Sequence, residues 1–311
     1  MADDLSRLRL RTASAILHCM SLRPFLQAWL RSAAVKKARE KAVDAARRHV
    51  EETAEQVQSA AGKHEPCHCG LVFALRIESG GLEDLLEQKS LIQAAAFTVC
   101  QGKLKDRRVA LAISGAGRKQ AAQAADALIS GHRPSWVISA GFAGGLNSQL
   151  KRHDILVADR LADVSGHHLA IDLPGDPAAL AEAPGVHVGR LLTADHVVRL
   201  PDEKQSLGRE HDAMAVDMET FAVAEVCRDR GVRFLSVRVI NDAVDDALPK
   251  DVEKLLTQKT TAARLGAAAG AIWRRPGSIK DMYALRENAL VASDRLAEFL
   301  AGMIEGLAVE D

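Results

Sequence analysis

The stretch V-D-M-E-T at residues 216–220, followed by R-V-I-N-D at residues 238–242, decides the fold of this chain. An apolar strand predicted over Ala213–Met218 ends in the carboxylate of Glu219, and a helix is predicted to begin at Phe221. A second strand, predicted over Phe234–Ile240, ends close to another carboxylate, Asp242. In a parallel sheet with helical crossovers, the carboxyl ends of neighbouring strands meet in one crevice, where such folds bind ligands. We therefore expect both acids to face one pocket.

Apolar strands and helices alternate on the N-terminal side of this stretch as well. Further strands are predicted over Gly70–Leu75, Ala96–Cys100, Val109–Ile113, Trp136–Ala140, Ile155–Ala158 and Arg190–Thr193. Helices are predicted over Leu82–Gln88 and Arg118–Ile129, while residues 160–190 are too rich in Gly, Pro and His to assign. This alternation predicts an α/β fold with a mixed, largely parallel twisted sheet flanked by helices.

Helical segments are predicted at both ends of the chain. Residues 1–66 are expected to form an N-terminal arm, with an amphipathic helix over Phe25–Ala60, and residues 67–311 the main α/β domain. Within that domain, residues 248–311 are predicted to be helical. The arm has a narrow face of Ala and Val, which favours packing on its own domain or on a partner subunit. Its excess of Arg also fits contact with a membrane surface, the less favoured alternative.

Composition excludes some classes of function. The chain has 311 residues, of which 48% are hydrophobic and 26% charged, enough for a buried core. Its 41 basic and 41 acidic side chains cancel, so no general attraction to nucleic acid is expected. Only 4% of the residues are aromatic, which argues against a base-stacking surface for single strands. A nucleic-acid partner is therefore not expected.

The cysteines indicate a reducing compartment. An odd number of cysteines, five, in a chain with no secretory signal at its start predicts a cytoplasmic protein. His64, Cys67, His68 and Cys69 contain metal-ligating side chains, but no second pair of ligands follows at the spacing of a zinc site. We expect neither a metal nor another cofactor.

Several ordered motifs resemble those of the purine nucleoside phosphorylase/nucleosidase superfamily. The V-D-M-E-T-F-A-V-A and R-V-I-N-D-A blocks are similar to its ribose-binding and base-binding motifs. Motifs further upstream occur in the same order as in this superfamily. They are C-G-L-V-F-A-L-R-I-E (69–78), V-A-L-A-I-S-G-A-G-R (109–118), V-I-S-A-G-F-A-G-G-L (137–146), residues 154–159 and L-L-T-A-D-H-V-V (191–198). The pattern is most similar to that of the 5′-methylthioadenosine/S-adenosylhomocysteine nucleosidases, and it spans about residues 68–245. The resemblance implies a nucleoside substrate and association into homo-oligomers.

The resemblance also implies the roles of four residues. Asp242 corresponds to the acid that contacts the base and protonates the leaving group; an isolated Asp would more often cap a turn or helix, but the R-V-I-N-D block around it favours the acid. Such an acid must keep its proton near neutral pH, so we expect burial to raise its pKa. Glu219 corresponds to the ligand of the ribose hydroxyls and Met218 to the residue packed on the sugar. Glu78 stands where the nucleosidases place the base that activates water, and the related phosphorylases have no such base.

Other positions depart from the nucleosidase pattern. Phe142 lies in the block of residues at the strand end where phosphorylases bind phosphate and nucleosidases usually keep a serine. Ser139 is then the hydroxyl-bearing residue of this block. Val197 and Val198 replace the aromatic and aliphatic pair that faces adenine, so weaker stacking on the base is expected. The glycine-rich turn before a helix could bind an anion through its backbone, or could simply be a tight turn. Its residues are Ser114, Gly115, Gly117 and Arg118.

Three functions are compatible with this sequence. The first is hydrolysis of the N-ribosidic bond of an adenosine-type nucleoside such as 5′-methylthioadenosine or S-adenosylhomocysteine. The second is phosphorolysis of a purine nucleoside or of a lipid-linked, hopanoid-type nucleoside, because R-R-P-G at residues 274–277 is similar to the tail of hopanoid-associated members. The third is nucleoside binding without catalysis, which the departures at Phe142 and Val197 would suit.

Overall fold

The computed structural model describes residues 66–93, 97–249 and 278–308. The strands are β1 (Cys69–Phe73), β2 (Glu87–Gln93), β3 (Thr98–Leu104), β4 (Arg107–Ile113), β5 (Trp136–Gly145), β6 (Ile155–Asp163), β7 (His168–Ala170), β8 (Val186–Thr193), β9 (Ala215–Asp217) and β10 (Arg233–Asp242). The helices are α2 (Arg76–Leu85), α3 (Arg118–His132), α4 (Pro177–Ala181), α5 (Pro201–His211), α6 (Thr220–Arg230) and α9 (Ser278–Gly306).

The sheet closes on itself at β5. This strand pairs in parallel with β1 and β10 and in antiparallel with β9, so it belongs both to a ring and to an open extension. The ring runs β5, β10, β6, β8, β9 and back to β5. The extension runs from β5 through β1, β4 and β3 to the edge strand β2. Parallel and antiparallel pairs both occur, which confirms the predicted mixed sheet with flanking helices.

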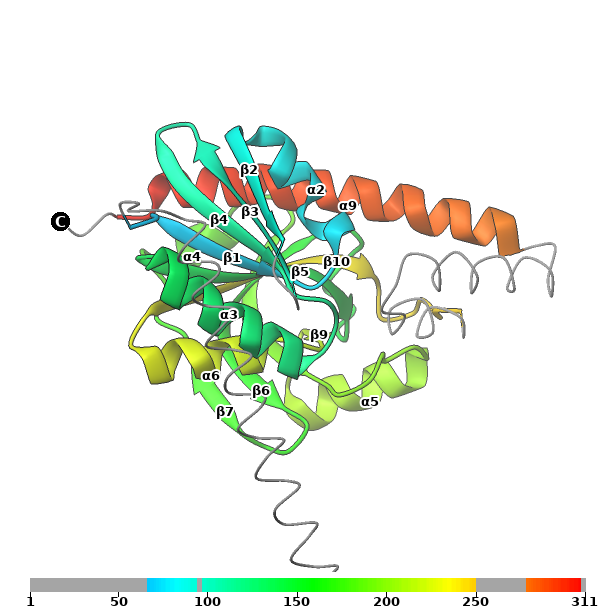
Figure 1. Ribbon diagram of the computed structural model, residues 1–311. Helices are drawn as coiled ribbons and strands as arrows, with labels where there is room; N and C mark the ends of the chain where they lie inside the picture. The colour runs from blue at the N-terminus through cyan, green and yellow to red at the C-terminus, as the bar shows by residue number, and fades with distance from the viewer. Residues whose placement is uncertain (1–65, 94–96, 250–277, 309–311) are drawn as a thin grey trace, which may run out of the picture. The chain divides into compact units, whose positions relative to one another are not determined.

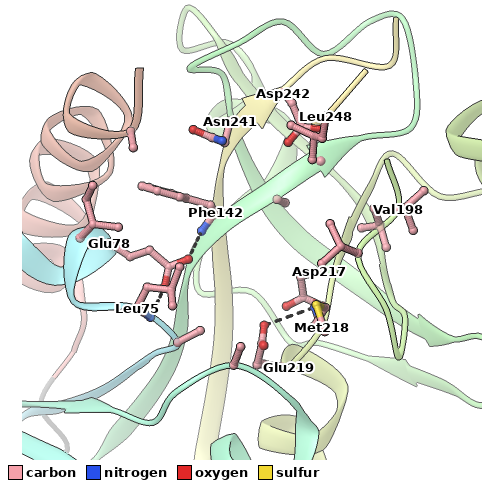
Figure 2. Close-up of a pocket in the computed structure, with 18 of the residues that line it drawn as sticks. Leu75, Glu78, Phe142, Val198, Asp217, Met218, Glu219, Asn241, Asp242 and Leu248 are labelled. Carbon is pink, nitrogen blue, oxygen red and sulfur yellow. Dashed lines mark hydrogen bonds between the residues drawn. The ribbon is translucent and has the colours of Figure 1, made fainter. Parts of the chain in front are cut away.

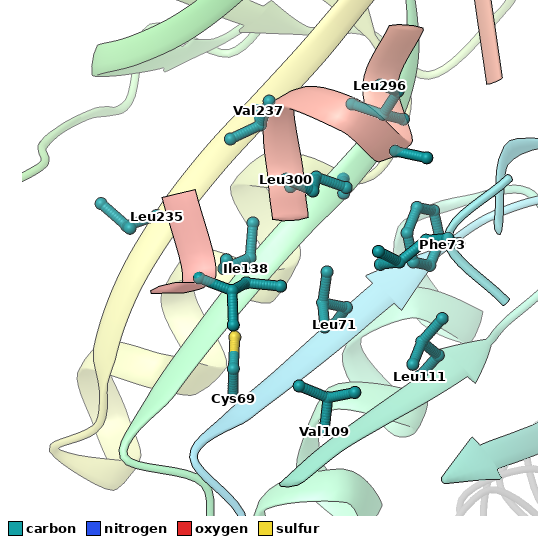
Figure 3. Packing of buried hydrophobic residues seen from close by; sticks show 14 of the residues in the cluster. Cys69, Leu71, Phe73, Val109, Leu111, Ile138, Leu235, Val237, Leu296 and Leu300 are labelled. Carbon is teal, nitrogen blue, oxygen red and sulfur yellow. The ribbon is translucent and has the colours of Figure 1, made fainter. Parts of the chain in front are cut away.

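Side-chain alternation along β1, β4 and β5 gives this part of the sheet two buried faces. Leu71, Leu111 and Ile138 belong to the core beneath α9, and Figure 3 shows them with Leu296 and Leu300 of that helix. Their neighbours Val72 and Val137 belong to a second core with α3 and α6. In Figure 1, α9 lies on one side of the sheet and α3 and α6 on the other. Burial on both faces explains why β1 and the buried part of β4 are continuously apolar.

Helix α9 is attached at its C-terminal end and at its crossing with α2. His68 Nε2 lies 3.3 Å from the carbonyl of Ile304, and the Trp136 indole donates to the carbonyl of Ala308 over 3.4 Å. At the crossing with α2, the amide of Gly81 donates to Ser293 Oγ over 3.1 Å. Helix α9 therefore stabilises the position of α2, which leads into the site described below.

Several predicted elements have different bounds in the structure. The predicted helix over Leu82–Gln88 is α2, which begins six residues earlier, at Arg76, and ends at Leu85. Strand β2 was not predicted, because its residues are almost all exposed and show no apolar pattern. Helix α5 was not predicted either, although Pro201 followed by two acids is a helix-start signal. The unassigned region 160–190 contains β7 and α4.

Several predictions fall partly or wholly outside the described residues. These are the N-terminal arm with its helix over Phe25–Ala60, the residue His64 and the helix over Val252–Trp273. The other metal-ligating residues named with His64 have partners within the chain: Cys67 Sγ contacts the carbonyl of Cys69 at 3.5 Å, and His68 contacts helix α9. None of the helices in the described ranges is long and apolar enough to cross a bilayer.

Candidate active site

A cavity of about 420 Å³ lies at the carboxyl ends of β1, β5 and β10. Its wall includes the predicted residues Glu78, Phe142, Val197, Val198, Met218, Glu219 and Asp242. Residues not predicted from the sequence also line it, namely Leu75, Ile77, Asp217, Asn241, Leu248 and Ala289 among others. Figure 2 shows Glu78 and Glu219 toward one end of the cavity and Asn241 and Asp242 toward the other. The carboxylates that the sequence placed on separate elements do converge.

Glu78 is held by two backbone donors. It lies in the first turn of α2, and its Oε2 accepts from the amide of Leu75 over 2.7 Å, as in a capping box. Its Oε1 accepts from the amide of Phe142 over 3.0 Å (Figure 2). Burial raises the pKa of Glu78, and the two amides and Arg238 oppose that rise. A side chain at Gly141 would place its Cβ 2.9 Å from Oε1, so glycine is required for this approach.

Glu219 lies opposite Glu78 at the start of α6. Its Oε1 accepts from the amide of Gly117 over 2.6 Å, and its Oε2 accepts from the amide of Met218 over 3.2 Å. Burial and the nearby charge of Asp217 raise the pKa of Glu219 to about 8. A group of this kind holds a proton at neutral pH and can both donate and accept hydrogen bonds.

A buried ion pair supports the turn that carries Met218 and Glu219. Arg238 of β10 donates to Asp217 Oδ2 from Nη2 over 2.8 Å and from Nε over 3.1 Å. The same Nη2 also donates to Ser139 Oγ over 2.7 Å. Thr193 Oγ1 donates to the other oxygen of Asp217 over 2.8 Å. Because every member of this network is buried, its charges are paired and its geometry is firmly held.

Asp242 and Asn241 both reach the cavity because β10 is irregular there. The register between β10 and β5 shifts between Ile240 and Asp242, which is a β-bulge that presents two successive side chains to one site. Asp242 is 6% exposed, and its Oδ2 lies 2.5 Å from the ammonium of Lys204 on α5. Burial raises the pKa of Asp242, as expected from the sequence, while Lys204 opposes that rise. The Oδ1 of Asn241 is buried without a protein partner.

A much smaller cavity adjoins Glu78, Glu219 and Arg238. Ser114 and Ser139 also line it. The space in which the centre of a water molecule could lie is about 10 Å³. That volume is enough for about one water molecule. Two carboxyl groups and one paired guanidinium surround it, so water has both donors and acceptors there.

The wall expected to face the base is aliphatic. Val197 and Val198 line the cavity, with Val198 buried and Val197 partly exposed. His196 also lines it, and its Nε2 lies 2.9 Å from Glu203 Oε1. Among the lining residues that the structure describes, only Phe142 has a six-membered aromatic ring, and it faces the cavity from the opposite side. A bound base would therefore contact mainly aliphatic side chains among the described residues.

The glycine-rich turn has its donors engaged within the chain. The amide of Gly117 donates to Glu219, and Arg118 pairs with Asp163 at 3.2 Å and with Asp195 at 2.9 Å. Ser114 Oγ donates to backbone carbonyls, at 2.7 Å to that of Gly115. The cation of this turn, Arg118, is thus already paired with two carboxylates, and their negative charges would repel an anion. This geometry weighs against the hypothesised anion site.

Four functional candidates were not predicted from the sequence. Asp217 and Arg238 each interrupt an otherwise apolar strand, and a charge in such a place is a usable signal of a buried pair. Asn241 lay inside the R-V-I-N-D motif without an assigned role. Lys204 gave no signal, because it stands in the charged run P-D-E-K of a polar helix.

Comparison with known proteins gives one matching family and several relatives. The model of the family described as "Phosphorylase superfamily" matches residues 70–273. A 5′-methylthioadenosine/S-adenosylhomocysteine nucleosidase of Haemophilus influenzae (strain PittGG) is 31% identical over 209 residues, which cover 60% of this chain and 91% of the relative. The protein of the same name from Staphylococcus aureus (strain JH9) is 26% identical over 216 residues, covering 62% and 94% of the two chains.

Solved structures agree with the fold. The 5′-methylthioadenosine/S-adenosylhomocysteine nucleosidase of Neisseria meningitidis, in complex with methylthio-immucillin-A, has a TM-score of 0.56 at 22% identity and covers 76% of this chain and 99% of its own. The futalosine hydrolase of Helicobacter pylori strain 26695 has a TM-score of 0.58 at 20% identity, covering 78% and 98%. At these identities the likeness is one of fold.

Proposed function

Because this chain belongs to the phosphorylase superfamily, we propose that it hydrolyses the N-ribosidic bond of an adenosine-type nucleoside whose 5′ substituent is apolar. Water adds to the anomeric carbon of the ribose as the bond to the base breaks. Glu78 takes a proton from this water, Asp242 gives a proton to the leaving base, and Glu219 with Met218 holds the ribose. Membership of a superfamily of nucleoside-cleaving enzymes is the premise of this proposal.

The small cavity beside Glu78 is the observation that favours water over phosphate as the nucleophile. The space open to the centre of a water molecule there is about 10 Å³, which suits about one water molecule. Phosphate would also bring its negative charge close to the carboxylate of Glu78, and the cation there, Arg238, is already paired with Asp217. Water needs only a base and a hydrogen-bond donor. Hydrolysis is therefore better supported than phosphorolysis.

The two acids have environments that suit opposite roles. Glu78 is fixed by two amides that favour its ionised form, and its raised pKa makes it a better proton acceptor than an exposed glutamate. Asp242 faces the far end of the cavity, where a base would lie if the ribose sat between Glu219 and Met218. Its raised pKa helps it to hold a proton for the leaving group.

The lining of the cavity supports an apolar 5′ substituent. Leu75, Ile77, Phe142, Leu248 and Ala289 contribute apolar surface, and His196 is the cavity's only basic residue among those the structure describes. A 5′-phosphate would thus meet no lysine or arginine in this part of the wall. Alkylthio groups suit the lining better, and a lipid-linked nucleoside is a second candidate on the same observation.

The test is product analysis with and without phosphate. The full-length protein should release adenine from 5′-methylthioadenosine at the same rate in both conditions, and the sugar product should be a free pentose. In water enriched in oxygen-18, the heavy atom should appear at the anomeric hydroxyl. Release that requires phosphate and yields a sugar 1-phosphate would overturn hydrolysis. Including adenosine 5′-monophosphate, S-adenosylhomocysteine and 5′-alkylthio analogues of increasing length tests the substituent.

Variants of the two acids separate catalysis from binding. Glu78→Gln and Asp242→Asn should each lower turnover by about 100-fold or more, the usual contribution of a general base or acid. Asp84→Asn is the matched control, because it changes an exposed carboxylate on the same helix as Glu78. Binding of adenosine-type ligands by calorimetry with no base release at any pH, in the unmodified protein, would instead favour the non-catalytic alternative.

A further inference from the structure

Helix α5 carries a lysine that is completely buried. Lys204 is 0% exposed, whereas every other residue of α5 is half-buried or exposed. Lysine is almost never found in this state without a partner, because removing its charge from water is costly. The burial therefore indicates a specific acceptor for its ammonium group.

Three acceptors surround the Lys204 ammonium. Its Nζ donates to Asp242 Oδ2 over 2.5 Å and to the carbonyls of Ala243 and Asp246 over 2.8 Å each. An ammonium group has three N–H donors, so these contacts satisfy all of them and favour the charged form. The site is thus complete within the chain and uses one oxygen of the proposed catalytic acid.

The turn after β10 is itself held in place. Asp246 Oδ2 accepts from the amide of Ala243 over 2.6 Å and from Arg152 Nε over 2.7 Å. The two carbonyls that face Lys204 are therefore presented by a fixed turn. The charged groups that act on Asp242 are Lys204 from α5, Asp246 from this turn and Arg152 from the segment before β6. Burial and Asp246 raise the pKa of Asp242, and Lys204 and Arg152 lower it.

We propose that Lys204 is the positioning residue for the acid of the reaction, an inference that rests on the proposed function. By holding Oδ2 it turns Oδ1 of Asp242 toward the leaving base. Its charge also stabilises the carboxylate that remains when the proton of Asp242 moves to the base. In the same step the bond between base and sugar breaks, water forms the new bond to the sugar, and Glu78 takes the proton of that water.

The first test is the pH dependence of turnover in Lys204→Met. This variant keeps a long side chain and removes the charge, so Asp242 should become a weaker acid. We expect kcat to fall about tenfold or more and the alkaline limb of the kcat/KM profile to move to higher pH. Arg209→Met, which removes an exposed charge from the same helix, should match the unmodified protein in both respects. A folded Lys204→Met protein with an unmoved limb would overturn the proposal.

Two further variants guard against a folding defect. Lys204→Gln is a second neutral replacement that can still reach a carbonyl, and it should move the limb in the same direction. Lys204→Arg keeps the charge but has a planar group that cannot reproduce the three contacts. Its limb should stay in place while kcat falls. A wild-type kcat in Lys204→Arg would overturn the anchoring of Oδ2.

A ligand-binding measurement separates this proposal from the proposed function. Proton uptake on binding of adenine, measured by calorimetry in two buffers over a pH series, reports the titration of Asp242 without turnover. The uptake curve should move to higher pH in Lys204→Met and stay in place in Arg209→Met. If the curve moves but no nucleoside is cleaved, the proposed function fails, while the effect of Lys204 on the titration of Asp242 stands. If nucleosides are cleaved and the curve does not move, the role of Lys204 fails alone.

Discussion

At the scale of single residues, the site is a group of acids that the protein keeps away from water. Glu219 is the clearest case, because burial and the charge of Asp217 raise its pKa to about 8, while the amide of Gly117 and Arg238 oppose the rise. Between the ordinary glutamate pKa of about 4.5 and pH 8, the folded protein binds a proton at Glu219 that the unfolded chain releases. The stability due to this group is therefore fully present below about pH 4.5 and is lost as the pH rises toward 8.

We predict that Glu219→Gln makes the free energy of unfolding less dependent on pH. Glutamine resembles the protonated acid and cannot ionise, so the decline between pH 5 and pH 8 should become smaller in the variant. The difference is up to about 5 kcal/mol over the whole window, at about 1.4 kcal/mol for each pKa unit. Urea unfolding at several pH values measures it, with Glu225→Gln on the same helix as the control. Equal slopes in the two variants would contradict the assignment.

At the scale of elements, the position of Glu78 depends on the crossing of α2 and α9. A Cβ at Gly81 would lie 2.9 Å from the carbonyl of Ser293 and 3.0 Å from the Cβ of Ala297, so the helices approach where only a hydrogen fits. Gly80, its neighbour in α2, has no such contact within 4 Å. The two glycines therefore have different roles in one helix.

Gly81→Ala should destabilise the protein by about 1–3 kcal/mol, because the added methyl group forces α2 and α9 apart. Turnover should also fall, since α2 carries Glu78. Gly80→Ala should be neutral or stabilise the protein by up to about 1 kcal/mol, because alanine favours the helix. Denaturant unfolding and nucleoside hydrolysis measure both effects. Equal stability and equal turnover of the two variants would show that the crossing with α9 does not fix the position of α2.

At the scale of the whole molecule, every residue proposed for catalysis or substrate binding lies after residue 66. The residues proposed for chemistry and substrate binding range from Leu75 to Ala289, and the family match begins at residue 70. The association of chains and the location of the protein in the cell remain predictions. The N-terminal arm over residues 1–66 is proposed to act on these two properties and not on the reaction.

Deletion of residues 1–62 should therefore leave a folded protein with turnover within about twofold of the full chain on a small nucleoside. Twofold corresponds to about 0.4 kcal/mol in the activation free energy. Light scattering and sedimentation with liposomes, compared between the two proteins, report the effect on assembly and on membrane contact. Loss of the folded core, or of turnover, would show that the arm belongs to the catalytic domain.

The local sequence pattern determined the class of fold and where the acids of the site lie. The hydrophobic periodicity of a strand or helix, and the residues that end it, can be recognised within a short stretch of sequence. The sequence alone therefore places an acid that follows an apolar strand at the edge of a sheet. Glu78, Glu219 and Asp242 were found from such local patterns and from the family motifs that contain them, and the folded chain brings all three to one cavity.

Only the tertiary structure decided how these acids are paired and buried. Asp242 meets Lys204 from 38 residues away, and Arg238 meets Asp217 and Ser139 from 21 and 99 residues away. Such pairs form because a buried charge needs a partner, which the folded chain can supply from any part of the sequence. The local sequence pattern therefore does not identify that partner. The closure of the ring at β5 and the approach of α9 to Gly81 depend equally on contacts distant in sequence. The chemistry of the acids thus follows from desolvation and long-range pairing, which exist only in the folded chain.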